Sequence, residues 1–289
     1  MFPLIGGKRF AELGRGDLHA VLEQVEKRGV GETVRKLRQY IGAIHRYAGA
    51  KDDSVIDPTP FLREGRRDIP PVVHHAMLPM SGLGEFILRC DQYDGEAETR
   101  LALRLTLLTA ARTMEVLGAR WDEFSDWNKD SKIASALWHI PGARMKAGDP
   151  HMIPLSRQAC GVLRQLHEIT GEGVNVFPIS RSTPGRRATM SNNTLLFAMY
   201  RLGYRGRATV HGFRRNFSTW ANEEGWPADD IELCLAHDER NEVRGAYNAA
   251  KRLEPRRKLL QAWADFLDRA RRDARIEAFL APDQPQRDS

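Results

Sequence analysis

Four side chains in one segment of the sequence have the chemistry needed to attack a phosphodiester without a metal ion. Listed in chain order, they are His211, Arg214, His237 and Tyr247. His211 and Arg214 are three residues apart, at a spacing that places both on one helix face and points them at one ligand. A tyrosine hydroxyl has a pKa of about 10 and reacts only when cations or a base lie beside it. The neighbouring histidines and arginine supply both.

Each of these residues also has an ordinary structural explanation. His211 can be a histidine at the start of a helix, and Tyr247 can be a half-buried packing residue. For either residue alone the structural explanation is the better one. The ordered set becomes informative only when it is joined to two motifs upstream.

The first upstream motif lies between Thr109 and Phe124. It places Arg112 at a break between two helices, with Glu115 three residues further on. An arginine held by a carboxylate is a common structural pair, so this motif alone does not indicate a site.

The second upstream motif is a predicted β-hairpin. Residues 134–140 and 151–155 have the composition of strands, and residues 141–150 form the turn between them, with Lys146 near its tip. A lysine at a hairpin tip is usually a solvated charge. Lys146 becomes a candidate only in the context of the other motifs, since it lies between Arg112 and His211 in the chain.

Together these motifs resemble the tyrosine recombinase (phage integrase) family, whose signature is His-x-x-Arg, then His or Trp, then a nucleophilic tyrosine. The resemblance runs from about residue 20 to residue 267 and is strongest between 101 and 250. It implies a catalytic set with one supporting carboxylate: Arg112, Lys146, His211, Arg214, His237 and Tyr247, supported by Glu115. Relatives often have proline where Thr113 stands, a departure that touches loop stiffness and not the reacting groups.

The resemblance also implies the roles of these residues. Tyr247 attacks the phosphodiester and forms a 3′-phosphotyrosyl enzyme with a free 5′-hydroxyl, and a 5′-hydroxyl of a partner strand reverses the step without ATP. Arg112 and Arg214 clamp the phosphate oxygens, and Lys146 is the general acid for the leaving 5′ oxygen. The two histidines supply hydrogen bonds and are candidates to accept the tyrosine proton. No metal ion and no cofactor are expected.

Composition limits the number of domains, the class of partner and the expected location of the protein. The 289 residues are 42% hydrophobic and 28% charged, enough for one large domain or two modest ones. A net charge of +6 favours polyanionic partners, although many basic proteins bind no nucleic acid. The three cysteines are far apart among apolar residues, which argues against disulfides and zinc clusters. No membrane-spanning run or signal peptide is evident, so a cytoplasmic location and no membrane partner are expected.

The elements that position these groups are mainly helical. Two amphipathic helices are predicted from Asp17, as N-cap, to Val25 and from Val34 to Ala48, with His45 on the outer face of the second and Ile44 on its apolar stripe. A linker follows at residues 63–71, and an almost entirely apolar helix at 98–111 is expected at the core. The fold class is therefore mainly α with a small antiparallel β-sheet (α+β).

The resemblance divides the chain into a small helical core-binding domain at 1–68, a mixed catalytic domain at 69–278 and a disordered tail at 279–289. Basic residues expected to contact DNA lie on the second helix and in a loop: Arg35, Lys36, Arg38, Arg46, Arg186 and Arg187. The alternatives are an ordinary solvated helix face and a mobile loop. Phage integrases of this type usually begin with an arm-binding domain. The expectation is that this domain is absent here and that the first helical domain is clipped at Met1.

The predicted function is site-specific recombination for integration or excision of a mobile element. The expected partners are a double-stranded DNA core site, a homo-tetramer on a Holliday junction and accessory DNA-bending proteins. The alternative is a catalytically silent DNA-binding protein of the same fold. A metal-dependent nuclease ranks lower because its two-ion site requires clustered carboxylates, which adjacent pairs such as Asp229 and Asp230 do not provide.

Overall fold

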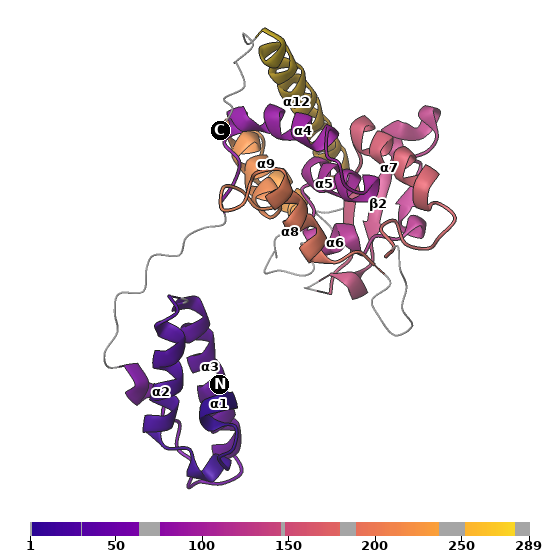
Figure 1. The fold of residues 1–289 in the computed structure, drawn as a ribbon. Coiled ribbons are helices and arrows are strands. Elements are labelled where there is room, and N and C mark those ends of the chain that lie inside the picture. Colours follow the sequence, from indigo (N-terminus) through magenta and orange to yellow (C-terminus); the bar gives the residue numbers. More distant parts are fainter. Residues whose placement is uncertain are drawn as a thin grey trace. The chain divides into compact units, whose positions relative to one another are not determined.

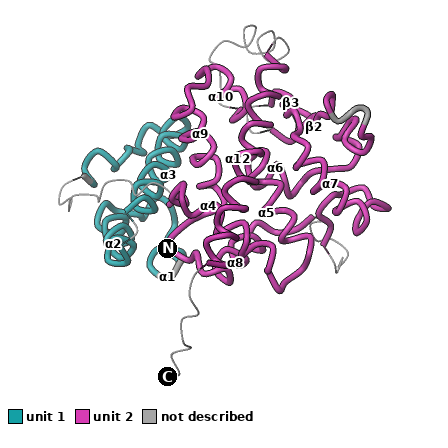
Figure 2. The backbone as a smooth tube through the Cα atoms, turned by 90° about the horizontal axis from the view of Figure 1, so that it is seen from above, with its two compact units in different colours: residues 1–74 teal, residues 75–289 magenta. Residues whose placement is uncertain are grey.

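The computed structural model describes residues 2–29, 31–63, 76–145, 148–179, 189–236 and 252–280. The chain divides into two compact units, residues 1–74 and residues 75–289, which Figure 2 shows in teal and magenta. Helices dominate both units, and the strands that the structure describes form one three-stranded antiparallel sheet in unit 2. The predicted fold class, mainly α with a small antiparallel sheet, is confirmed.

Unit 1 is built from three helices, α1 (Phe2–Ile5), α2 (Arg15–Glu26) and α3 (Gly31–Gly49). Its core contains the following buried apolar residues: Leu18, Leu22, Val34, Ile41 and Leu62. The prediction that Asp17 caps α2 is wrong by one turn. The N-cap is Gly14, and the Asp17 carboxylate accepts a hydrogen bond from the Gly14 N–H at 3.1 Å. Asp17 therefore serves the helix start from its third position, where a carboxylate also favours the helix dipole.

The inner face of α3 differs from the predicted stripe. His45 is buried, and its Nδ1 lies 2.8 Å from the Ile41 carbonyl oxygen, whereas Ile44 is 53% exposed. The residues Val34, Ile41 and His45 follow one another at spacings of seven and four, which keeps them on a single face. The placement of His45 on the outer face and of Ile44 on the inner face was therefore wrong.

Unit 2 is organised around α5 (Ala97–Thr109), nine of whose thirteen residues are buried. It contacts α4 (Leu83–Asp91), α7 (Arg157–Thr170), α8 (Asn192–Arg201) and α9 (Gly212–Glu223), as seen in Figure 1. A helix surrounded by other helices needs apolar residues on every side, which explains the composition of α5. The prediction of a central core helix is confirmed.

The sheet contains β1 (Phe124–Ser125), β2 (Leu137–Ile140) and β3 (His151–Pro154), in the order β1-β2-β3. In the register of β2 and β3, Trp138 lies opposite Ile153 and Ile140 lies opposite His151. The two predicted strands of the hairpin are thus confirmed. Ile140 and His151, the residues that flank the connection between the two strands, are paired in this register.

The remaining elements are α6 (Thr113–Leu117), α10 (Ala228–Cys234) and the long α12 (Leu253–Leu280). The first half of α12 packs on the rest of unit 2 through Trp263. This side chain is fully buried and donates its indole N–H to the Leu107 carbonyl at 2.8 Å. The rings of Phe217, Trp220 and Phe266 surround it. None of the helices in the described part of the chain is long and apolar enough to cross a membrane.

Candidate active site

Arg112 lies where α5 ends and α6 begins. Ala110 closes α5 in the left-handed conformation, with φ of 50°, and Arg112 is the extended N-cap of α6. The Glu115 carboxylate accepts the Arg112 backbone N–H at 2.8 Å and its Nη1 at 2.9 Å, and it is buried. Glu115 thus orients the guanidinium, whose side chain remains 32% exposed. A buried carboxylate that holds a partly exposed arginine leaves that arginine available to an anion.

Arg214 comes from the first turn of α9 and is 5% exposed. Its guanidinium donates to the carbonyls of Ala110, at 2.7 Å, and of Leu235. Burial lowers the pKa of Arg214 to about 10, and the positive charge of Arg112 adds to that effect. The Arg214 side chain therefore keeps its charge at neutral pH, and it lies in the electrostatic field of Arg112. The structure brings Arg112 and Arg214 close together, since they bond to the carbonyls of the successive residues Ala236 and Leu235.

Arg112 and Arg214 meet at the end of α10, where His151 also binds. Three successive residues there engage three different partners through their backbones. Cys234 bonds to the ring of His151, the Leu235 carbonyl accepts from Arg214, and the Ala236 carbonyl accepts from Arg112 at 2.9 Å. The last carbonyls of a helix have no partner within the helix and carry partial negative charge. They are therefore natural acceptors for cationic side chains.

His211 is the N-cap of α9 and its side chain is exposed, while Arg214 in the same turn points into the protein. The start of α9 rests on the segment after residue 75, because the Thr209 N–H donates to the Ala76 carbonyl at 3.0 Å. Gly212 permits this close approach, since a Cβ there would lie 2.7 Å from the Ala76 oxygen. The glycine between His211 and Arg214 is thus required by the backbone that packs against it.

Several predicted residues lie outside the described residues, and no geometry is given for them: Lys146, Arg186, Arg187, His237 and Tyr247. The base of the hairpin that carries Lys146 is nevertheless anchored near Arg112. Arg144 pairs with the buried Glu123 and donates to the Glu115 backbone carbonyl. Among the described residues, the structure brings together Arg112, Glu115 and Arg214, with His211 at the start of the same helix as Arg214.

The residues predicted to contact DNA on α3 lie in unit 1. Lys36 is exposed and Arg38 is half-buried. Arg35 pairs with Glu32 at 2.7 Å, and Arg46 pairs with Asp57 at 2.6 Å. Both arginines remain more than half exposed, so these surface pairs can be exchanged for phosphate contacts at small cost.

His151 is a residue of the site that sequence reasoning treated only as part of a strand. It is buried at the start of β3, beside Arg256, Arg214 and Arg112. A signal for it existed, because strand alternation places position 151 on the same side as Ile153, which is also buried. Burial, followed by the positive charge of Arg256, lowers the pKa of His151 to about 3. The imidazole is therefore neutral.

This pKa predicts how the stability of the protein depends on pH. The unfolded chain protonates His151 near its ordinary pKa of 6.5, whereas the folded protein does so only near pH 3. The unfolded state therefore binds more protons between these values, and folding stability falls as the pH is lowered through that range. Between pH 6.5 and pH 5 we expect a loss of about 2 kcal/mol from this group.

Urea unfolding of the wild type and of His151→Gln at both pH values measures the effect. The amide of glutamine can still donate to the Cys234 backbone but does not titrate, so the variant should show a correspondingly smaller pH dependence. Equal pH dependence in the two proteins would contradict a buried neutral His151.

Glu115→Gln is expected to weaken the support of Arg112. One of the two carboxylate oxygens is replaced by an N–H donor that faces the donors of Arg112, so a hydrogen bond to a charged group is lost. The expected loss of stability is about 2–3 kcal/mol, measured by urea unfolding. Glu85→Gln, which disrupts the exposed pair with Arg89, is the matched control and should change little. Equal effects of the two substitutions would show that Glu115 is not a buried support.

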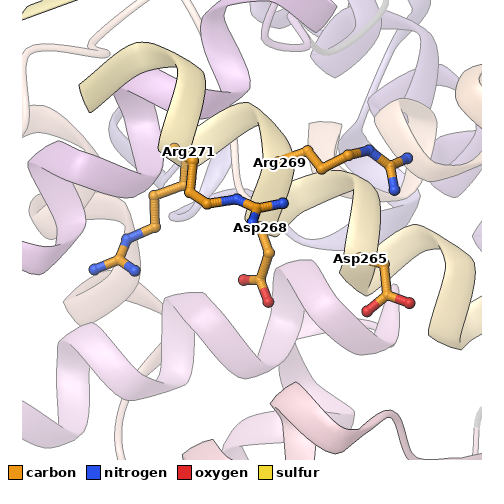
Figure 3. A pocket seen from close by; sticks show the side chains of 5 residues that line it. Asp265, Asp268, Arg269 and Arg271 are labelled. Carbon is orange, nitrogen blue, oxygen red and sulfur yellow. The ribbon is translucent and has the colours of Figure 1, made fainter. Parts of the chain in front are cut away.

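Other features of the structure do not add residues to this site. Across the described ranges, no group of three or more His, Cys, Asp or Glu side chains is arranged to hold a metal ion. A pocket of about 460 Å³ along α12 is lined by charged residues (Figure 3): Asp265, Asp268, Arg269, Arg271 and Arg272. The carboxylates of Asp265 and Asp268 both accept from Gln158, and none of the predicted site residues lines the pocket.

Comparisons with known proteins identify the family of this chain. Residues 84–254 match the family described as the phage integrase family, and residues 1–65 match the phage integrase central domain. The integrase of Enterobacteria phage P4 is 36% identical over 285 residues, which cover 93% of this chain and 62% of that protein. The prophage integrase IntA of Escherichia coli K12 is 35% identical over 271 residues, or 93% of this chain and 63% of that protein. The chain thus spans about three fifths of the length of these two relatives.

Solved structures show the same fold at lower identity. A lambda integrase (residues 75–356) dimer bound to a COC′ core site has a TM-score of 0.56 and 16% identity, covering 83% of this chain and 81% of that chain. A lambda integrase tetramer bound to a Holliday junction has a TM-score of 0.59 and 18% identity, covering 80% of this chain and 66% of that chain.

Proposed function

Because the chain belongs to the phage integrase family, we propose that it is a site-specific DNA recombinase for integration or excision of a mobile element. The observation that carries the proposal is the convergence of Arg112 and Arg214, from segments about a hundred residues apart, at the end of α10. Two fixed guanidinium groups suit a phosphate that gains charge in a transition state. The segment that begins directly after them contains His237 and Tyr247.

The proposed reaction has two steps, cleavage of one strand and its rejoining to another. The Tyr247 oxygen attacks the phosphorus in line and loses its proton, with His211 or His237 as acceptor. The bond to the 5′ oxygen breaks, and that oxygen takes a proton from Lys146. The product is a 3′-phosphotyrosyl linkage and a free 5′-hydroxyl. Attack by a 5′-hydroxyl of a partner strand reverses both transfers, so the phosphodiester count is conserved and ATP is not consumed.

The contacts of the two arginines support their proposed role as a clamp. A guanidinium carries five N–H donors in one plane. Arg112 and Arg214 each donate to two protein acceptors, and a guanidinium held in this way has further donors for a phosphate oxygen. The carbonyls of Leu235 and Ala236 fix the orientation of Arg214 and Arg112 before DNA arrives. Donors fixed in advance do not need to reorganise during the reaction.

The binding of DNA is proposed to be shared by the two parts of the chain. Residues 1–68 would act as the core-binding domain, with phosphate contacts from Arg35, Lys36, Arg38 and Arg46 on α3. Residues 69–278 would act as the catalytic domain, with further contacts from Arg186 and Arg187. The proposed assembly is a homo-tetramer on a Holliday junction, with accessory DNA-bending proteins. The sequence pI of about 9.4 supports a polyanionic partner.

The test is covalent capture in the presence of EDTA. The protein is incubated with a pool of randomised duplexes that each carry one nick, so that no target sequence has to be assumed. Denaturing electrophoresis then separates covalent from non-covalent species. A covalent protein–DNA band that forms in EDTA and enriches one sequence is the expected result.

Two other outcomes would overturn the proposal. Cleaved DNA without a covalent band would indicate hydrolysis, as in a nuclease. Salt-sensitive binding with neither cleavage nor a covalent band would indicate the silent DNA-binding alternative.

A further inference from the structure

The segment 237–251, which contains His237 and Tyr247, begins after α10 and ends at the start of α12. A short ion pair connects the first turn of α10 to Arg252, the residue directly before α12. The Asp230 carboxylate in α10 accepts from Nε of Arg252 at 2.7 Å and from its Nη2 at 3.0 Å. The Asp230 side chain is only 2% exposed, and Arg252 is 32% exposed. This two-point contact fixes both the distance and the orientation of its partners.

Strand β3 completes the connection on both sides. His151 at its first residue bonds to the Cys234 backbone at the end of α10. Arg256 in the first turn of α12 is 1% exposed and donates to the carbonyl of Met152 at 2.9 Å. Figure 2 shows α10, β3 and α12 as separate elements of unit 2. Each of the three is thus tied to the other two by a polar contact that is largely removed from water.

Arg252 keeps its positive charge in this ion pair. Hydrogen bonding to Asp230 raises the pKa of Arg252 above its ordinary value. The Asp230 carboxylate, buried in the first turn of α10, would lose two hydrogen bonds from a charged group if Arg252 were removed. Breaking a buried ion pair is strongly unfavourable, so this pair holds α10 and the start of α12 together.

These contacts bear on the reaction because they hold α10 in place, and the residues at the end of α10 bind the arginine clamp. The carbonyls of Leu235 and Ala236, which engage Arg214 and Arg112, directly precede residue 237. A nucleophile on a chain segment reaches its phosphate reproducibly only when both ends of that segment are fixed relative to the groups that hold the phosphate.

We infer that Asp230 and Arg252 are positioning residues for strand cleavage, and that their ion pair fixes α10, which carries the arginine clamp and precedes the nucleophile-bearing segment, relative to the start of α12, which follows that segment. The inference rests on the proposed function. It predicts a defect in the rate of the covalent step and not in the affinity for DNA, because Asp230 is buried and Arg252 is held by it in a two-point contact.

The experiment measures the first-order rate of covalent trapping on a nicked duplex at saturating DNA, together with the DNA concentration that gives half-saturation. Arg252→Gln is expected to lower the rate about 100-fold, the effect of a displacement near one ångström, with unchanged half-saturation. Arg252→Lys keeps the charge but not the two-point contact and should recover part of the rate. Asp230→Asn combined with Arg252→Gln should be no slower than Arg252→Gln alone, because the two residues act as one unit.

The matched control is Arg271→Gln. Arg271 also ties α12 to another helix, through a 2.6 Å contact with Asp91 of α4, but it lies far along α12 from residue 252. All variants are assayed at a temperature at which circular dichroism shows them folded. Trapping by Arg271→Gln should stay within about twofold of the wild type, as expected for a surface ion pair.

The outcomes separate this inference from the proposed function. A folded Arg252→Gln protein that traps DNA at the wild-type rate would overturn the inference, as would an equal loss in Arg271→Gln. Failure of the wild type itself to form a covalent complex would instead overturn the proposed function.

Discussion

Tyr247→Phe is expected to abolish the covalent protein–DNA complex while leaving DNA binding nearly unchanged. The substitution removes only the hydroxyl, which under the proposed mechanism is the sole atom that attacks the phosphorus. Loss of a nucleophile that acts with other groups lowers the rate by at least about 10⁴-fold, since the remaining groups cannot replace its bond to the substrate. The measurement is the covalent band in EDTA, compared with the half-saturating DNA concentration of each protein.

Mapping of the adduct provides the control. Protease digestion of the wild-type complex, followed by mass spectrometry, should place the nucleotide on the peptide that contains Tyr247. Tyr200→Phe, a change on α8 next to Arg205, should trap normally. A persistent adduct in Tyr247→Phe, attached to another residue, would refute the assignment of the nucleophile.

Arg214→Lys is expected to have the second largest effect, because it acts on catalysis and on folding together. The Arg214 guanidinium reaches the Ala110 and Leu235 carbonyls at once, whereas an ammonium group is a point charge that cannot span both in the same geometry. One buried carbonyl would lose a charged donor, so stability should fall by about 2–3 kcal/mol. The transition state would lose a two-point phosphate contact, and the trapping rate should fall about 10³-fold.

Arg215→Lys is the matched control, because Arg215 is the next residue on α9 and is exposed. Urea unfolding and the trapping rate are measured for both variants. Wild-type trapping by a folded Arg214→Lys protein would remove this residue from the catalytic set. A loss of equal size in Arg215→Lys would show that the effect belongs to α9 as a whole.

Local patterns were sufficient to predict most of the elements that carry the site. The apolar character of α5, the alternation of β2 and β3, and the His-x-x-Arg spacing on α9 depend on residues close in sequence, and so they are readable without a structure. The family and the fold class could be inferred in the same way. The errors also arose locally: Asp17 was assigned to the cap position three residues from the actual cap, and His45 was assigned outward because histidine is polar.

Long-range contacts account for what the sequence could not show. The Arg112 and Ala236 partners are separated by 124 residues, and the Arg214 and Ala110 partners by 104. Their acceptors are backbone carbonyls, which every residue possesses, so no residue type marks them. The same holds for the burial of His151 and for the pairing of Asp230 with Arg252.

The sequence by itself thus determined which groups are present and on which elements they lie, because helix and strand periodicity follow from neighbouring side chains. Only the tertiary structure decided that two arginines and a neutral histidine meet at the end of α10. The physical reason is that unpaired carbonyls at a helix end acquire their partners from whatever elements the fold packs against them.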